Sequence, residues 1–311
     1  NTPYVCFDYS FDSIQCIINL NCLFQFFLMF CRYLYHHLLL KFLVLFIRVP
    51  IILWTKFMTY KKLTFMASND LEAKEALIKL TKRYKDFGIE AADVVVALGG
   101  DGFMLQTLKS VSTKNVAVYG MNKGTVGFLM NTFNYENLEE RIQKAKEEIV
   151  NPLKMIATKI DGTKEEELAI NEVSILRSGP QAAKLSISID GSEKLQELVC
   201  DGALVCTPAG STAYNYSAHG PILPIGANIL GLTAISAYRP RRWRGALLPL
   251  DATIDIEVKS ANKRPVSAVA DTSEVKGVKH VSITIEKKFK HKLLFDPGHG
   301  LEERLLKEQF E

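Results

Sequence analysis

Residues 93–102 read DVVVALGGDG. The first six letters form a β-branched run that is typical of a strand buried on both faces of a parallel sheet. Two glycines then end the run, and residues 103–111 carry apolar side chains at helical spacing. A buried strand, a glycine-rich turn and a helix in this order predict a parallel α/β layer.

The neighbouring residues fit the same layer. Residues 62–68 predict a short buried strand with a helix after it, and residues 115–119 predict a second buried strand that ends at a glycine. A charged helix is predicted over residues 135–150. We therefore expect an α/β domain with a parallel, Rossmann-like sheet over residues 58–150.

The second half of the chain has a different period. Apolar and polar residues alternate over residues 185–189, 254–258 and 281–285, and Asp-Gly turns separate such runs. This pattern predicts a β-rich, mostly antiparallel domain over residues 151–311, with a closing helix over residues 302–310.

Residues 1–57 have a composition of their own, with no Gly or Ala and few charged residues. Three interpretations are open: a membrane anchor, an extra helix that packs on the folded part, or an upstream stretch that is not part of the working protein. The apolar tract is interrupted by Arg32, Lys41 and Arg48, which weakens the first interpretation. We favour the third, with Met58 as the start, because AT-rich DNA translated outside a gene gives such a composition.

Charge and cysteine content exclude several classes of protein. The formal net charge of +4 gives no support for a nucleic-acid-binding surface, and we expect the arginine cluster at residues 239–244 to form a subunit interface or an ion-pairing strip. Six cysteines without a CxxC pair predict neither a disulfide framework nor a zinc site. A reducing, cytoplasmic location is the expectation.

The turn of Gly99, Gly100, Asp101 and Gly102 is the first candidate site. Glycines at a helix start let backbone N–H groups approach an anion. The turn is neither a Walker A loop nor a GxGxxG fingerprint. A carboxylate in a phosphate cradle repels polyphosphate, so Asp101 either caps the helix, or holds magnesium, or accepts a proton from a hydroxyl nucleophile.

Two further stretches contain polar groups suited to a nucleotide. Residues 201–214 (DGALVCTPAGSTAY) lead from a short strand to a loop rich in small hydroxyl side chains, and Tyr214 could stack on a base. Asn171 and Glu172 lie in a strand-like stretch, residues 168–176. Taken alone, the first stretch is also an ordinary solvated turn and the second is also surface polarity.

Together and in this order, these motifs closely resemble those of the bacterial NAD kinase family, and the later ones look like its alphaproteobacterial branch. The resemblance runs from about Met58 to the C-terminus. Its matching stretches are LGGDG (98–102), NKGTVGF (122–128), NEVS (171–174), DGALVCTPAGSTAY (201–214), YRPRRWRGALLP (238–249) and LFDPGHGLEER (294–304).

This resemblance implies transfer of the γ-phosphoryl group of ATP to the 2′-hydroxyl of the adenosine ribose of NAD, with Asp101 as general base. Phe103 and Ala209 depart from residues common in the family, which leaves the reaction intact but puts fine substrate contacts in doubt. The residues that the resemblance places at the nucleotides are Gly99, Gly100, Gly102, Phe128, Asn171, Glu172, Asp201, Ala209, Thr212, Ala213, Tyr214, Asn215 and Ser217.

The same resemblance implies NAD and ATP as partners and a homodimer or homotetramer. Magnesium is expected to arrive on the phosphates of ATP, because the motifs hold no cluster of carboxylates for a protein metal site. We expect no membrane association for residues 58–311. Two alternatives remain: a lipid kinase of the diacylglycerol or sphingoid type, which shares the GGDG turn, and a non-catalytic nucleotide-binding sensor.

Overall fold

The computed structural model describes residues 60–122, 127–241 and 243–310. These residues belong to one compact unit, Thr59–Glu311. The interpretation of residues 1–57 therefore lies outside the described residues, as do four positions of the NKGTVGF motif and one arginine of the cluster at residues 239–244. The expected domain boundaries stay a prediction.

The first sheet is mostly parallel and has the order β1-β2-β3-β18-β5, with β4 paired to β3. Only β5 runs antiparallel to its neighbour. Its strands are β1 (Leu63–Ala67), β2 (Val94–Leu98), β3 (Ala117–Asn122), β4 (Asn131–Thr132), β5 (Lys146–Val150) and β18 (His291–Phe295).

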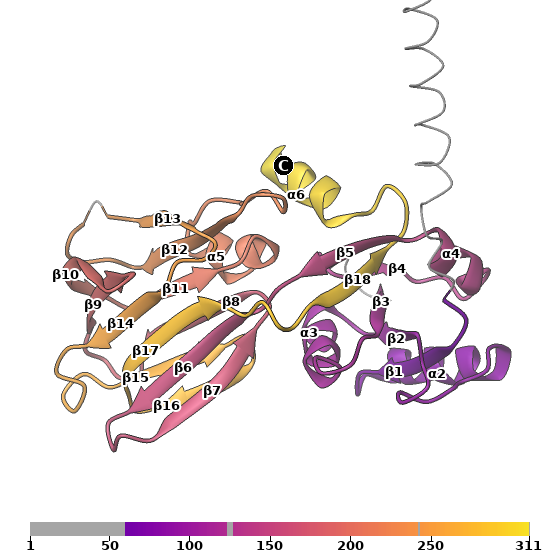
Figure 1. Ribbon diagram of the computed structural model, residues 1–311, viewed down its shortest axis with the longest axis horizontal. Coiled ribbons are helices and arrows are strands. Elements are labelled where there is room, and N and C mark those ends of the chain that lie inside the picture. The colour runs from indigo at the N-terminus through magenta and orange to yellow at the C-terminus, as the bar shows by residue number, and fades with distance from the viewer. Residues whose placement is uncertain (1–59, 123–126, 242, 311) are drawn as a thin grey trace, which may run out of the picture. The chain divides into compact units, whose positions relative to one another are not determined.

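Helices cover both faces of this sheet. Alternate residues of β2 point to opposite faces, and each set packs against different helices. Val95 packs in one apolar cluster with residues of α3 (Asp101–Ser110). Val94 packs in another with residues of α2 (Leu71–Arg83) and α4 (Leu138–Lys144). The predicted α/β layer is confirmed, and Figure 1 shows these helices beside the strands.

The end of the chain returns to this first sheet. Strand β18 lies between β3 and β5, pairing parallel with the first and antiparallel with the second (Figure 1). The helix predicted over residues 135–150 ends at Lys144, and residues 146–150 form β5 instead. Pairing with β18 decides this conformation, and a charged sequence contains no local sign of a partner strand that far along the chain.

The second half contains two six-stranded antiparallel sheets, of order β10-β9-β14-β17-β6-β7 and β13-β12-β11-β8-β15-β16. Both contribute side chains to one shared apolar core, so they form a sandwich. The antiparallel, β-rich prediction is confirmed. The strands are β6 (Leu153–Lys159), β7 (Lys164–Ala169), β8 (Glu172–Arg177), β9 (Ala183–Ile189), β10 (Ser192–Cys200), β11 (Gly202–Cys206), β12 (Ile229–Ile235), β13 (Gly245–Pro249), β14 (Ile254–Val258), β15 (Val266–Ala270), β16 (Ser273–Lys276) and β17 (Val278–Ile285).

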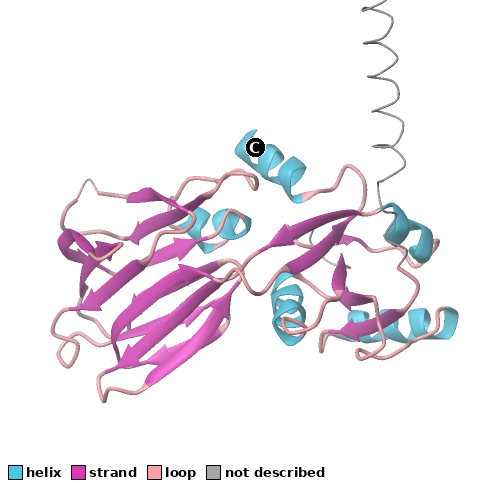
Figure 2. Cartoon of the chain, viewed as in Figure 1, coloured by secondary structure: helices cyan, strands magenta, loops and turns pink. Residues whose placement is uncertain are grey.

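Few helical turns accompany the sandwich, as the colouring in Figure 2 shows. A 3₁₀ turn, η1 (Ala209–Thr212), and a short helix, α5 (Tyr214–Ser217), follow β11. The closing helix α6 (Leu301–Phe310) begins one residue earlier than predicted. Within the part of the chain that the structure describes, no helix has the length and apolar character needed to cross a bilayer.

Candidate functional site

The glycine-rich turn joins β2 to α3. Gly100 is the N-cap of α3 and Asp101 is its first residue. A Cβ atom at Gly99 would lie 2.9 Å from the Cβ atom of Phe103, so a larger residue would crowd the first turn of the helix. Gly100 and Gly102 are exposed. The turn therefore presents a helix N-terminus to solvent at the carboxyl end of a parallel strand, a place suited to anions.

Asp101 does not cap its own helix; its carboxylate faces a separate segment, residues 127–129. Oδ2 accepts a hydrogen bond from the backbone N–H of Phe128 at 2.7 Å, and Oδ1 accepts one from that of Leu129 at 3.0 Å. Gly127 leaves room for this approach, since a Cβ atom there would lie 2.5 Å from the Cγ atom of Asp101. A carboxylate offers about four lone-pair sites. Among the described residues, the N–H groups of Phe128 and Leu129 occupy two of these sites.

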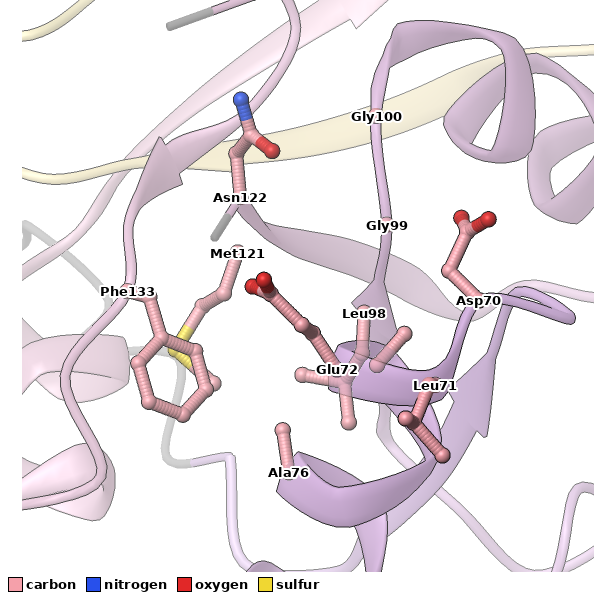
Figure 3. Close-up of a pocket in the computed structure, with 11 residues that line it drawn as sticks. Asp70, Leu71, Glu72, Ala76, Leu98, Gly99, Gly100, Met121, Asn122 and Phe133 are labelled. Carbon is pink, nitrogen blue, oxygen red and sulfur yellow. The ribbon is translucent and has the colours of Figure 1, made fainter. Parts of the chain in front are cut away.

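A pocket of about 490 Å³ lies where β2 and β3 end and α2 begins. Figure 3 shows Glu72 directing its carboxylate from the first turn of α2 toward the centre of this pocket. Ligands of open α/β sheets bind at the carboxyl ends of the strands. The lining residues are Asp70, Leu71, Glu72, Ala73, Ala76, Leu98, Gly99, Gly100, Met121, Asn122 and Phe133.

The sequence predicts one strand-like stretch through Asn171 and Glu172, but the structure has two strands there. Strand β7 ends at Ala169 and β8 begins at Glu172, so the chain turns between them. Asp271 holds this turn. Its carboxylate accepts hydrogen bonds from the backbone N–H groups of Ile170 at 2.6 Å, Asn171 at 2.9 Å and Glu172 at 3.3 Å.

The Glu172 side chain is half-buried, with its Oε2 atom shielded from solvent. Its Oε2 atom has no hydrogen-bond partner among the described residues. Burial, followed by repulsion from Asp271, raises the pKa of Glu172 to about 8, although the backbone N–H of Tyr214 opposes the shift. Burial also raises the pKa of Asp271, against its three N–H donors. Glu172 is therefore a neutral hydrogen-bond donor near neutral pH, able to bind an acceptor on a ligand.

The loop after β11 packs closely against the same turn. The Thr207 hydroxyl donates to the carbonyl of Ile170 at 2.7 Å, and the backbone N–H of Thr207 donates to the carbonyl of Asn171 at 2.9 Å. At Gly210, a Cβ atom would lie 2.4 Å or less from the backbone of Asn171, which only glycine allows. Backbone contacts thus fix Asn171 relative to the loop.

Asn215 has a different environment from the one expected of a residue that lines a site. It is fully buried, and its amide donates to the carbonyls of Ser211 at 3.0 Å and Pro221 at 2.9 Å. Its oxygen accepts from the Thr233 hydroxyl at 2.7 Å. These bonds hold α5 in place, and a direct contact between Asn215 and a nucleotide stays a prediction.

The other predicted positions differ in exposure. Asp201 forms an ion pair with Arg177 at 2.6 Å. Burial raises the pKa of Tyr214, and the charges of Glu172 and Asp201 raise it further. Ala209 is buried, whereas Ser217 is exposed. The half-buried positions are Phe128, Thr212, Ala213 and Tyr214.

The predicted residues thus form two groups, one around Asp101 and one around Glu172, and α3 connects them. Asp101 begins this helix, and Lys109 near its end donates to a carboxylate oxygen of Glu167 in β7 at 2.5 Å and to the hydroxyl of Ser273 in β16 at 2.7 Å. Asp271 lies in the turn between β15 and β16. The helix therefore links the phosphate turn to the turn that carries Glu172.

Three residues of this arrangement were missed from the sequence. Asp271 is a single acid in a hairpin turn, and its φ of 50° is a left-handed value that Asp tolerates better than most residues. Thr207 precedes a proline in an ordinary-looking loop. Arg304 lies in the closing helix and donates to the 127–129 segment. Thr207 and Arg304 lie in stretches that match the family, but the sequence assigns them no role, because each of the three acts on backbone far away in the chain.

No group of three or more His, Cys, Asp or Glu side chains that could hold a metal ion occurs among residues 60–122, 127–241 and 243–310. Cys200 and Cys206 are free and buried. Burial raises the pKa of each thiol to about 12, so both stay protonated and unreactive.

Comparisons with known proteins agree on one family. Family models match residues 34–151 as the ATP-NAD kinase N-terminal domain and residues 170–293 as the ATP-NAD kinase C-terminal domain. An NAD kinase of Cereibacter sphaeroides is 59% identical over 253 residues, which cover 81% of this chain and 100% of the relative. One from Caulobacter vibrioides is 54% identical over 249 residues, which cover 80% and 96%.

Solved structures share the fold at lower identity. A yeast NADH kinase complexed with NADH has a TM-score of 0.68 at 21% identity, over 83% of this chain and 89% of that one. An NAD kinase from Archaeoglobus fulgidus in complex with ATP has a TM-score of 0.64 at 22% identity, over 80% and 98%. The matched models and relatives confirm the resemblance deduced from the motifs: this chain belongs to the ATP-NAD kinase family.

Proposed function

We propose that this enzyme transfers the γ-phosphoryl group of ATP to the 2′-hydroxyl of the adenosine ribose of NAD, with Asp101 as general base. Family membership supports the reaction. The observation that supports the role of Asp101 is its position at the N-terminus of α3, where two backbone N–H groups hold the carboxylate beside the phosphate turn. The hydroxyl proton passes to Asp101 while the 2′-oxygen bonds to the γ-phosphorus, and the bond from that phosphorus to ADP breaks.

The buried polar groups around Glu172 suit the adenosine end of NAD. Protonated Glu172 donates a hydrogen bond, the Asn171 amide offers both a donor and an acceptor, and the half-buried Tyr214 ring provides a stacking surface. A site built to hydrogen-bond its ligand rejects analogues that lack the matching groups. We assign Asp201 to the more exposed, nicotinamide side of the same site.

The pocket at the end of β2 and β3 suits the donor nucleotide. Gly99 and Gly100 line it immediately before Asp101, and its volume is in the range of small-molecule sites. The Glu72 carboxylate, which points into the pocket (Figure 3), offers acceptors for hydroxyl or amino groups of a nucleoside. In this proposal, magnesium enters the site bound to the phosphates of ATP and would neutralise part of their charge.

The test measures NADP formation by the full chain with NAD, ATP and Mg²⁺. We expect Asp101→Asn to lower kcat by about 10²- to 10⁴-fold, the usual contribution of a general base. Asp251→Asn, an exposed aspartate that does not line the pocket, is the matched control and should keep most of the activity. Full activity of Asp101→Asn in a folded enzyme would refute the assignment of the base.

The two alternatives raised by the sequence are not favoured. The matched domain models and the relatives at 51–59% identity are NAD kinases, not lipid kinases or sensors. Cytoplasmic location and a homodimer or homotetramer complete the proposal. The buried free thiols of Cys200 and Cys206 fit a reducing compartment, and light scattering of the purified chain measures the oligomer directly.

A further inference from the structure

The closing helix reaches the segment that Asp101 contacts. From α6, Nη1 of Arg304 donates a hydrogen bond to the carbonyl of Gly127 and another, at 3.1 Å, to the carbonyl of Phe128. The N–H groups of Phe128 and Leu129 donate to Asp101. The 127–129 segment is therefore held on both sides, by its amides to Asp101 and by its carbonyls to Arg304.

Arg304 is itself fixed in one orientation. Its Nε atom donates to the carbonyl of His299 at 3.0 Å, and its guanidinium carbon lies 5.7 Å from the ring centre of Phe295. Burial lowers the pKa of Arg304, while the charges of Asp101, Asp296 and Glu148 raise it. A guanidinium keeps its charge in such surroundings, and its fork geometry serves several acceptors at once.

Among the described residues, Arg304 is the donor that holds the carbonyl of Gly127. Gly127 has no side chain, and glycine has the largest backbone freedom of any residue. If Arg304 released these carbonyls, the peptide bonds after Gly127 and after Phe128 could rotate. The N–H groups of Phe128 and Leu129 would then no longer point at Asp101. The carboxylate would then lose the donors that set its direction.

From these contacts we propose that Arg304 is a positioning residue for the reaction. It orients the 127–129 segment, and this segment in turn holds the Asp101 carboxylate in the direction needed to receive the hydroxyl proton. The inference rests on the proposed role of Asp101 as base. It gives the C-terminal helix a part in catalysis through the contacts of Arg304 with backbone carbonyls.

The test compares Arg304→Met and Arg304→Lys with Glu302→Gln, an exposed residue of the same helix. Displacement of a catalytic group by 1 Å can cost about 10²-fold in rate, so we expect kcat to fall by about 10- to 100-fold in Arg304→Met. KM for NAD and for ATP should change little, since the hydrogen bonds that Arg304 loses go to backbone carbonyls. Arg304→Lys keeps the charge but not the fork, and should recover only part of kcat.

A second measurement detects the position of the segment directly. Amide hydrogen exchange of Phe128 and Leu129 should be faster in Arg304→Met than in Glu302→Gln, because local opening becomes easier. Added guanidinium ions should restore part of the kcat of Arg304→Ala, which a merely destabilised enzyme would not show. Should Arg304→Met fail to fold, Arg304→Lys and its exchange rates decide the question.

The outcomes separate this inference from the proposed base. Unchanged kcat and unchanged amide exchange in a folded Arg304 variant, alongside an inactive Asp101→Asn, overturn the role of Arg304 alone. An active Asp101→Asn removes the base and the positioning role together. Loss of kcat with retained KM, faster exchange at Phe128 and rescue by guanidinium support the inference.

Discussion

Replacing Gly127 by Ala tests the contact on which the site depends. The added Cβ atom would lie 2.5 Å from Cγ of Asp101, whereas ordinary van der Waals contacts begin near 3.4 Å. The carboxyl group must therefore retreat by about 1 Å, since the helix backbone behind it is fixed. A displacement of about 1 Å is enough to cost roughly 10²-fold in rate when the group must meet a reacting atom.

Stability should also fall, because the shift breaks or stretches the two bonds from Phe128 and Leu129 to the carboxylate. Hydrogen bonds to charged groups contribute about 1.5–3 kcal/mol each. We expect Gly127→Ala to lose about 2–5 kcal/mol in the free energy of unfolding, less than the sum because both groups can relax.

The assay is steady-state NADP formation together with urea unfolding. Gly226→Ala is the matched control, since a Cβ atom at Gly226 meets nothing within 4 Å. It measures the effect of a glycine-to-alanine change on the unfolded chain alone, which is usually below about 1 kcal/mol. If Gly127→Ala retains kcat within about twofold of Gly226→Ala, Asp101 does not need the direction that this contact imposes, and the reasoning fails.

Two further predictions concern the turn that carries Glu172. The pKa of Glu172 is about 8 in the folded enzyme and 4.5 in the unfolded chain, so between these values the folded enzyme keeps a proton that the unfolded chain loses. The free energy of unfolding should therefore fall by up to about 1.4 kcal/mol per pH unit as the pH rises from 4.5 to about 8. Glu172→Gln should flatten this part of the Tm–pH curve, and parallel curves for the two proteins would contradict it. Asp271→Asn replaces the carboxylate that accepts from three N–H groups by an amide, and should lower the free energy of unfolding by about 1–3 kcal/mol. It should also raise KM for NAD relative to the control Asp251→Asn, which changes an exposed residue. Equal KM values for the two variants would show that Asp271 does not position the turn for NAD.

The parts of the fold that the sequence predicted are those with local causes. The buried run before Gly99 predicts a strand by composition, and the glycines and the polar residue after them predict a turn and a helix start. The sequence of residues 146–150 favours a helix, because Lys and Glu are good helix formers. Their strand conformation comes from pairing with β18, nearly 150 residues later, which no local pattern contains.

The candidate site shows the same division. Asp101 stands out as a charge in a phosphate turn, so its sequence position alone suggests chemistry. Asp271 and Thr207 are unremarkable residues in loops, and their importance depends on which backbone groups the fold brings to them. Asn215 shows the reverse case. The sequence places it at the ligand, but in the structure both its amide nitrogen and its amide oxygen form hydrogen bonds within the protein.

The return of the chain to the first sheet explains how Arg304, far along the chain, is held in place beside residues 127–129. Asp296, directly after β18, accepts the Tyr119 hydroxyl at 2.7 Å and pairs with Arg141 of α4. The Asn131 amide donates to the carbonyl of Leu294 at 2.9 Å, and its oxygen accepts from the backbone N–H of Asp296. These bonds fix the exit of β18, and α6 starts only five residues beyond Asp296. Arg304 therefore reaches the 127–129 segment from a rigid base, and the direction of the Asp101 carboxylate depends on the last strand of the protein as much as on the glycine-rich turn.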